Sequence, residues 1–179
     1  MELLEHARVT SIVSYDMPSF QIVSLSLQPF APLSSLSSKR LSHQGAVRVK
    51  ASSNPGYPCR ISLVDAELDE ELLLLPFEHH PESSPYRSSG PTYVRAGATQ
   101  RTFNAGQIQE YVRLLRFLLR AYDDSHMVVA VEVCVGAEVE VEIELHFGNL
   151  LISYIHLHNA KRKCFACLVG CAPEPSCAT

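Results

Sequence analysis

"YIHLHNAKRKCFACLVGC", residues 154–171, predicts two strands joined by a basic turn. Successive side chains of a strand point to opposite faces of a sheet. Tyr154, His156 and His158 would therefore share one face, and Ile155 and Leu157 would share the other. The apolar face is expected to pack on a core, and the polar face to be solvated or to line a pocket. This stretch thus predicts both the end of the fold and the edge of a site.

Alternating apolar residues predict further strands before this stretch. The segments concerned are residues 20–33 (FQIVSLSLQPFAPL, in which Pro29 ends the strand), 46–51 (AVRVKA), 59–80 (CRISLVDAELDEELLLLPFEHH, two strands around an acidic turn), 92–97 (TYVRAG) and 126–136 (HMVVAVEVCVG). Residues 80–91, HPESSPYRSSGP, carry three prolines and a glycine, so we expect a loop there rather than a central strand. A loop of that length is a reasonable place for function.

One long amphipathic helix is predicted over residues 105–124, AGQIQEYVRLLRFLLRAYDD. Its apolar face would consist of Ile108, Tyr111, Val112, Leu115, Leu118, Leu119 and Tyr122. Arg113, Arg116 and Arg120 would share a solvated side, with Arg120 kept as a site candidate because it lies at the helix end. Residues 137–147, AEVEVEIELHF, fit a strand or a helix with Val139, Ile143, Phe147 and Leu150 in one stripe. A helix is favoured because glycines bound the segment, and its glutamates would then be exposed rather than bind a cation.

The predicted fold class is α+β, with a mainly antiparallel sheet, the long amphipathic helix and one or two short helices. Residues 34–45, SSLSSKRLSHQG, would form one of the short helices or a turn. We expect a single domain over residues 17–170, an N-terminal extension at 1–16 and a C-terminal tail at 171–179.

Composition limits the function. The 179 residues are 46% hydrophobic and 19% charged, which is sufficient for a packed core. A net charge of −4 argues against a nucleic-acid-binding surface, and no apolar run is long enough to span a membrane. Glu2 and Glu5 are unlike the start of a secretory signal. We therefore expect a cytoplasmic protein with reduced cysteines, and the sequence carries no signal of an oligomeric state.

A metal site at His156 and His158 is possible but not favoured. Two imidazoles at positions i and i+2 of a strand can bind one ion, but a third ligand such as His79, Glu78 or Cys164 would be needed. Arg162 and Lys163 would repel a cation nearby. The Cys164–Cys167 pair is weak evidence for zinc, since the two thiols would point to opposite faces of a strand.

Cys59 is a second kind of candidate. Arg60 follows it and could lower the pKa of the thiol, which with a nearby histidine would make a nucleophile. The alternative interpretation is a buried strand cysteine.

Five motifs resemble, in order, those of a mostly bacterial family known as domain of unknown function 1203. They are PGYPCRISLVDAE (55–67), LLLLPFEH (72–79), SPYRSSGPTYVR (84–95), LRAYD (119–123) and YIHLHNAKRKCFA (154–166), and the resemblance extends over about residues 20–169. The matching positions are Cys59, Arg60, Asp65, Glu78, His79, Ser84, Pro85, Tyr86, Gly90, Pro91, Arg95, Arg120, Tyr122, His156, His158, Asn159 and Cys164. The chain differs in its N-terminal extension, in Lys163 where a glycine is common, and in the added Cys167, Cys171 and Cys177. The resemblance implies no activity, but its polar composition is typical of a site.

These observations together predict one pocket that holds an anionic small molecule. The loop 78–91 and the face of Tyr154, His156 and His158 would meet there. The anion would be bound by arginines and polar groups, namely Arg60, Tyr86, Arg95, Arg120 and Asn159. His79, His156 or His158 could act as an acid or base. Two alternatives stay open: a non-catalytic interaction module, and a thiol-dependent enzyme that uses Cys59 with a histidine.

Overall fold

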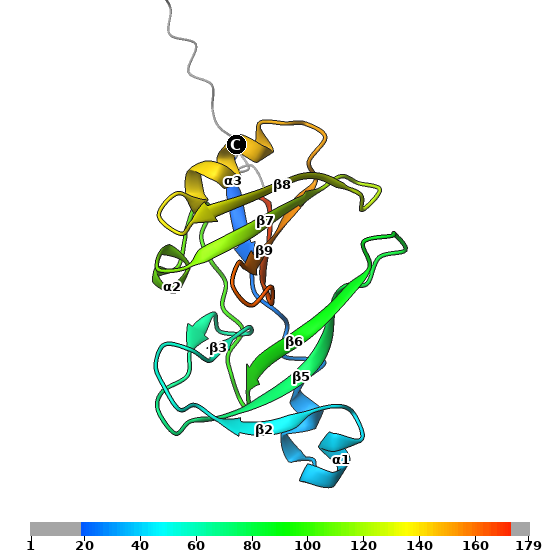
Figure 1. Cartoon of the computed structure of the whole chain (residues 1–179), viewed down its shortest axis with the longest axis vertical. Helices are drawn as coiled ribbons and strands as arrows, with labels where there is room; N and C mark the ends of the chain where they lie inside the picture. The colour runs from blue at the N-terminus through cyan, green and yellow to red at the C-terminus, as the bar shows by residue number, and fades with distance from the viewer. Residues whose placement is uncertain (1–18, 173–179) are drawn as a thin grey trace, which may run out of the picture.

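A computed structural model describes residues 19–172 of the chain (Figure 1). Its elements are β1 (Phe20–Val23), a 3-10 helix (Ala31–Ser35), α1 (Ser38–Ser42), β2 (Val47–Lys50), β3 (Pro58–Cys59), β4 (Val64–Asp65), β5 (Glu71–His80), β6 (Ser88–Arg95), α2 (Glu110–Arg113), β7 (Arg116–Tyr122), β8 (Val128–Val135), α3 (Val139–Phe147), β9 (Tyr154–Asn159) and β10 (Phe165–Cys171). The expected extension 1–16 and Cys177 lie outside the described residues, as does most of the expected tail.

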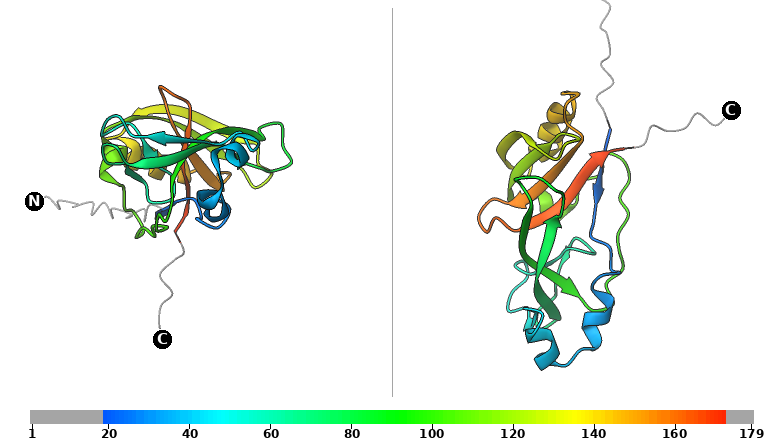
Figure 2. Two further views of the ribbon diagram at one scale, coloured as in Figure 1. Left: turned by 90° about the horizontal axis from the view of Figure 1, so that it is seen from below. Right: turned by 90° about the vertical axis from the view of Figure 1, so that its right-hand side faces the viewer.

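The strands form two lobes. One lobe is a five-stranded antiparallel sheet of order β1-β10-β9-β7-β8, and the other contains a three-stranded antiparallel sheet of order β2-β5-β6 beside the short β3–β4 pair (Figures 1 and 2). We call them the five-stranded lobe and the three-stranded lobe. The predicted sheet-rich α+β class with mainly antiparallel strands is confirmed. No helix in the described part is long and apolar enough to cross a membrane.

The predicted long helix over residues 105–124 is wrong. The chain forms only the short helix α2 there and then the central strand β7, which pairs with β8 on one side and β9 on the other. Phe117 and Leu119 face the core, whereas Leu118 and Arg120 face the other lobe. Because both faces of β7 are covered, its apolar residues do not alternate cleanly with polar ones, and the run also fits a helical period. Pairing on both edges of the strand outweighs the helical propensity of the leucines.

The helical interpretation of residues 137–147 is confirmed by α3. Val139, Ile143 and Phe147 are buried against the five-stranded sheet, whereas Leu150 lies beyond the helix and is 98% exposed. Ile155 and Leu157 of β9 belong to the same core, as the alternation of the opening stretch predicted.

The predicted loop at residues 80–91 is shorter than expected. Strand β6 begins at Ser88, and it pairs Pro91 with Pro76 of β5, so only residues 81–87 connect the two strands. A proline is tolerated at that point because β6 is an edge strand of its sheet.

Candidate functional site

Four histidines meet where the two lobes face each other; we call His79, His80, His156 and His158 the histidine cluster. His156 and His158 project from β9 on the face opposite the core. A bulge between Glu78 and His80 interrupts the β5–β6 ladder at His79, where β5 reaches the other lobe. The His79 ring centroid lies 5.1 Å from that of His158 and 6.1 Å from that of His156. The sequence predicted this meeting of His79, His156 and His158.

Aromatic rings enclose the cluster. His79 stacks on Phe165 with centroids 5.0 Å apart, and His80 stacks on Tyr122 at 4.5 Å. Arg120 lies opposite His156 in the β7–β9 register. The predicted neighbourhood of Arg120 and the histidines is therefore present in the fold.

Burial keeps these imidazoles neutral. His156 and His158 are each 2% exposed, although we expected their face to be solvated or to line a pocket. Burial, followed by the charges of the neighbouring histidines and Arg120, lowers the pKa of His156 to about 2. The pKa of His158 is lowered to about 3 and that of His79 to about 4, again mainly by burial. Neutral imidazoles can donate or accept a proton, but these would do so against a large cost of charging.

The cluster is short of hydrogen-bond partners. Nδ1 of His79, His80 and His156 and Nε2 of His158 are buried without a partner among the described residues. No group of three or more His, Cys, Asp or Glu side chains in that part of the chain is arranged to hold a metal ion. Of the expected third ligands, Glu78 pairs with Arg87 at 2.6 Å, and the Cys164 thiol donates to the Arg162 carbonyl at 3.6 Å.

A chain of hydrogen bonds connects the cluster to the surface. The Tyr154 hydroxyl lies 2.9 Å from Nε2 of His80 and 2.9 Å from Nδ1 of His126. Nε2 of His126 is 3.4 Å from the Glu82 carboxylate. Burial raises the pKa of Tyr154 to about 12, so its hydroxyl keeps its proton and can donate to one imidazole while accepting from the other.

A cleft of about 840 Å³ lies between the two lobes, and Arg60 is part of its lining; we call it the cationic cleft. Its charged lining consists of five cations and one carboxylate: Arg60, Arg113, Arg116, Lys161, Arg162 and Asp65. Arg113 pairs with Glu140 at 2.8 Å. The side chains of Arg116, Lys161 and Arg162 form no ion pair with any residue in the range 19–172. The cleft is therefore a region of concentrated positive charge on a chain whose net charge is negative.

Hydrogen bonds within the β9–β10 turn fix the backbone at Lys161 and Arg162. The Asn159 Oδ1 accepts hydrogen bonds from the backbone N–H groups of Lys161 and Arg162, at 3.1 and 2.9 Å, and so fixes the β9–β10 turn. Lys163 closes the turn with φ +58°, in the left-handed region that glycine favours. The positive φ explains why a glycine is common at this position in the family that the chain resembles.

Arg60 links the cleft to the histidine cluster. It lines the cleft yet is only 5% exposed, and its charge contributes to the lowered pKa of His158. Among the predicted site residues, Arg60 and Asn159 thus belong to the cleft, while His79, His156, His158 and Arg120 belong to the cluster. Tyr86 is 40% exposed on the β5–β6 connection, close enough to Tyr122 to affect its pKa.

Cys59 and Arg95 lie away from both sites. Cys59 is 0% exposed in the core of the three-stranded lobe. Burial raises the pKa of its thiol, but hydrogen bonds from Ser62, Arg95 and Ile61 outweigh this effect and leave the pKa lowered. Arg95 donates to Glu70 at 3.0 Å and to the Ser62 hydroxyl at 3.0 Å. This arrangement fits a buried structural thiol.

We expect iodoacetamide to alkylate Cys59 at neutral pH at least about tenfold more slowly than the partly exposed Cys164, because a buried thiol reacts only after local opening. Peptide mass spectrometry over a time course measures both rates in one sample. Equal rates would instead favour the thiol-dependent enzyme.

Sequence reasoning missed the cations of the cleft. Arg113 and Arg116 were assigned to the solvated side of a helix, and Arg162 was considered only as a charge that would repel a metal. These residues are far from Arg60 in the chain. The pairing of β7 with β9 brings Arg116 beside the β9–β10 turn, and the cleft between the two lobes brings Arg60 to the same place. His80 was also missed, although it adjoins the candidate His79 and could have been found for that reason, whereas Tyr154 was predicted on the same face as His156 and His158.

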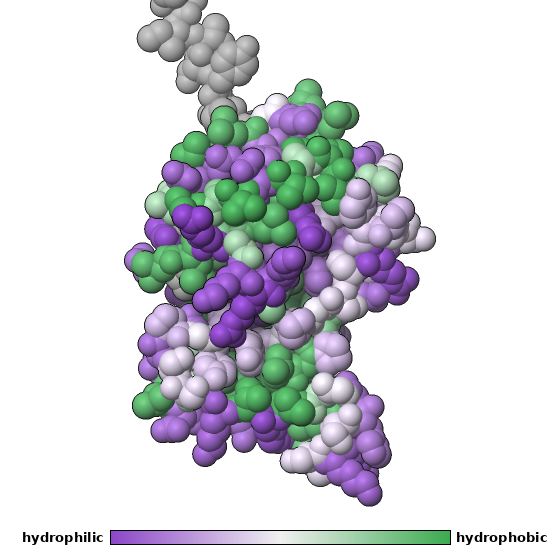
Figure 3. Space-filling view, in the orientation of Figure 1, coloured by the Kyte–Doolittle hydropathy of each residue, from purple (hydrophilic) through white to green (hydrophobic). Residues whose placement is uncertain are grey.

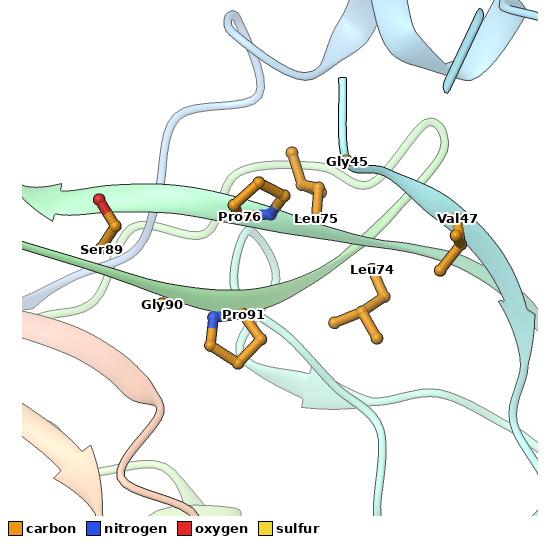
Figure 4. A pocket seen from close by; sticks show the side chains of 8 residues that line it. All are labelled: Gly45, Val47, Leu74, Leu75, Pro76, Ser89, Gly90 and Pro91. Atoms are coloured by element: carbon orange, nitrogen blue, oxygen red, sulfur yellow. The ribbon is translucent and has the colours of Figure 1, made fainter. Parts of the chain in front are cut away.

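A second hollow lies on the three-stranded sheet (Figure 4). It measures about 420 Å³ and is lined by small and apolar residues: Gly45, Val47, Leu74, Leu75, Pro76, Ser89, Gly90 and Pro91. It contains no charged or titratable side chain, so the cationic cleft is the better candidate site.

The comparisons with known proteins give a family but no activity. Curated proteins and solved structures yield no significant match. The sequence model of one family, described as protein of unknown function (DUF1203), matches residues 56–170, which include the histidine cluster and all the charged residues of the cleft. The family predicted from the five motifs is confirmed, and the chain belongs to the DUF1203 family.

Proposed function

We propose that this protein binds an anionic small molecule in the cationic cleft. The observation that carries the proposal is the convergence on one cleft of Arg116, Lys161 and Arg162, which form no ion pair within residues 19–172, while the cleft lining contains a single carboxylate, Asp65. Arginine side chains recognise carboxylates and phosphates by paired hydrogen bonds. Arg116, Lys161 and Arg162 have no ion pair to break within the described residues, so they can bind a ligand without losing an existing contact.

The size of the cleft also supports a small-molecule ligand. Ligand pockets commonly measure about 300–1,000 Å³, and 840 Å³ lies within that range. The neighbouring histidine cluster would give such a site neutral acid–base groups close to Arg60.

Pyrophosphate is the first probe, because it carries several charges in a small volume. At about 100 times its dissociation constant, a ligand stabilises the folded state by about 2.7 kcal/mol, which would raise Tm by about 5 to 10 °C for a domain of this size. We expect a saturable rise of this order in a thermal melt at fixed ionic strength.

Matched variants distinguish a site from general salt effects. The double substitution Arg116→Gln/Arg162→Gln should remove most of the shift, whereas Arg40→Gln, an exposed arginine of α1 outside the cleft, should retain it. A shift that is absent from the unmodified protein, or identical in both variants, would refute the proposal. Co-purification of a protein partner with no anion effect would favour the interaction module.

A further inference from the structure

The lining of the cationic cleft combines charged and apolar side chains from both lobes. The five-stranded lobe supplies Arg113, Arg116, Lys161 and Arg162 from α2, the start of β7 and the β9–β10 turn, beside the apolar residues Leu114, Leu115, Val135 and Ala137. The three-stranded lobe supplies Arg60 and Asp65 and a group of apolar residues that we call the apolar wall: Pro55, Pro58, Leu74, Pro91 and Tyr93. Figure 3 shows hydrophilic side chains gathered in the middle of the molecule in this view, with hydrophobic side chains both above and below them. A bare inorganic anion would use only the charged part of this lining.

The apolar wall is rigid and includes an aromatic ring. Tyr93 packs edge-to-face on Tyr57, with ring centroids 5.4 Å apart and an interplanar angle of 61°. The Tyr57 hydroxyl is in turn within 2.9 Å of the Ser52 hydroxyl, so the ring pair is fixed from behind. The neighbouring prolines have a fixed φ. An aromatic ring in the lining of a cleft can bind planar ring systems by stacking.

Asp65 restricts where charge can lie on the ligand. Its Oδ1 accepts a hydrogen bond from the Gly56 N–H at 2.8 Å, and Oδ2 has no hydrogen-bond partner among the described residues. Asp65 belongs to β4, in the three-stranded lobe. It can accept a hydrogen bond from an N–H or O–H group of the ligand, but it would repel a second anionic group at that end.

We propose that the ligand is a phosphate monoester of a planar aromatic or heterocyclic compound. Its phosphate contacts Arg116, Lys161 and Arg162, its ring lies against Tyr93, and a donor on the ring contacts Asp65. This assignment rests on the proposed function, because it specifies the class of anion that the same cleft would bind.

The test compares three probes by isothermal titration calorimetry: inorganic phosphate, 1-naphthyl phosphate and cyclohexyl phosphate. We expect 1-naphthyl phosphate to bind about fivefold or more tightly than either of the others, since stacking on one aromatic side chain contributes at least about this factor. Tyr93→Leu should reduce this preference and leave the affinity for inorganic phosphate unchanged. Tyr93→Phe should keep the preference, and so should Tyr86→Leu, which changes an exposed tyrosine outside the cleft.

A fourth probe examines Asp65. We expect 4-carboxyphenyl phosphate to bind the unmodified protein more weakly than phenyl phosphate does. The two esters should bind equally well to the Asp65→Asn variant, which keeps an oxygen that accepts the hydrogen bond from the Gly56 N–H. If phosphate binds but the aromatic esters bind no tighter, the ligand class is wrong and the anion site stands. If none of the phosphates binds, both proposals fail.

Discussion

Acidification from about pH 7.5 to about pH 5 is expected to lower the free energy of unfolding by about 4 kcal/mol. The cause is His156 and His158, whose pKa values in the folded protein are lowered to about 2 and about 3. In the unfolded chain both would titrate near the ordinary value of about 6.5. Below that value the unfolded state binds two protons that the folded state does not, at about 2 kcal/mol per histidine by about pH 5.

The sign and the pH window distinguish this effect from ordinary acid unfolding. The contribution of the two neutral histidines to the free energy of unfolding is fully present above about pH 6.5, and it is lost as the pH falls toward their folded-state pKa values. Surface carboxylates stay largely ionised at about pH 5, so their loss contributes little in this range.

Urea denaturation at a series of pH values measures the slope. His156→Gln should reduce it by about one proton, and His43→Gln, at an exposed site after α1, should not change it. If His156→Gln does not fold, His158→Gln provides the same comparison. A free energy of unfolding that is constant between about pH 7.5 and about pH 5 would contradict the proton-free cluster.

Gly136→Ala is expected to destabilise the fold by about 3 kcal/mol or more. A Cβ atom at this position would lie 2.0 Å from the Val112 carbonyl oxygen and 2.6 Å from the Arg113 carbonyl carbon. Both are backbone atoms, which no side-chain rotation can move. The Gly136 N–H also donates to the Leu115 carbonyl at 2.6 Å, so α2 and the start of α3 are held close together there.

Gly170→Ala is the matched control. Its Cβ atom would be 4.0 Å from the nearest side-chain atom, at ordinary contact distance, so the cost should be small. Chemical denaturation of the two variants gives the difference directly. Equal stabilities would contradict this prediction and show that α2 can move without cost. Because Gly136 also lines the cationic cleft, the thermal melts with pyrophosphate should be repeated on both variants.

The parts of the fold that were predicted correctly have one exposed or polar face. β9 alternates because only Ile155 and Leu157 belong to the main core, and α3 repeats Val139, Ile143 and Phe147 because its other side is solvated. β7 does not have one apolar and one solvated face, because the three-stranded lobe covers the face that would otherwise contact water. Recognising β7 as a strand requires the neighbouring strands and the opposing lobe, which the local sequence pattern does not show.

The same reason divides the site predictions. Three members of the histidine cluster, His79, His156 and His158, were predicted because they fall in short motifs, although their burial was not expected, since burial comes from the opposing lobe. The cationic cleft was only half found, through Arg60 and Asn159. Its remaining cations come from segments about fifty residues or more from Arg60 in the chain, and their convergence is a property of strand order.

The pairing of β1 with β10 has a consequence for synthesis on the ribosome. Phe20 lies opposite Cys171, and β10 is the neighbour of β1 in the sheet, while the three-stranded lobe is inserted between β1 and β7 (Figure 2). The inserted lobe can form while translation continues, because its own strands are complete by Arg95. The first strand must remain without its sheet partner until the last one has left the exit tunnel, so the five-stranded lobe closes only after translation has passed residue 171.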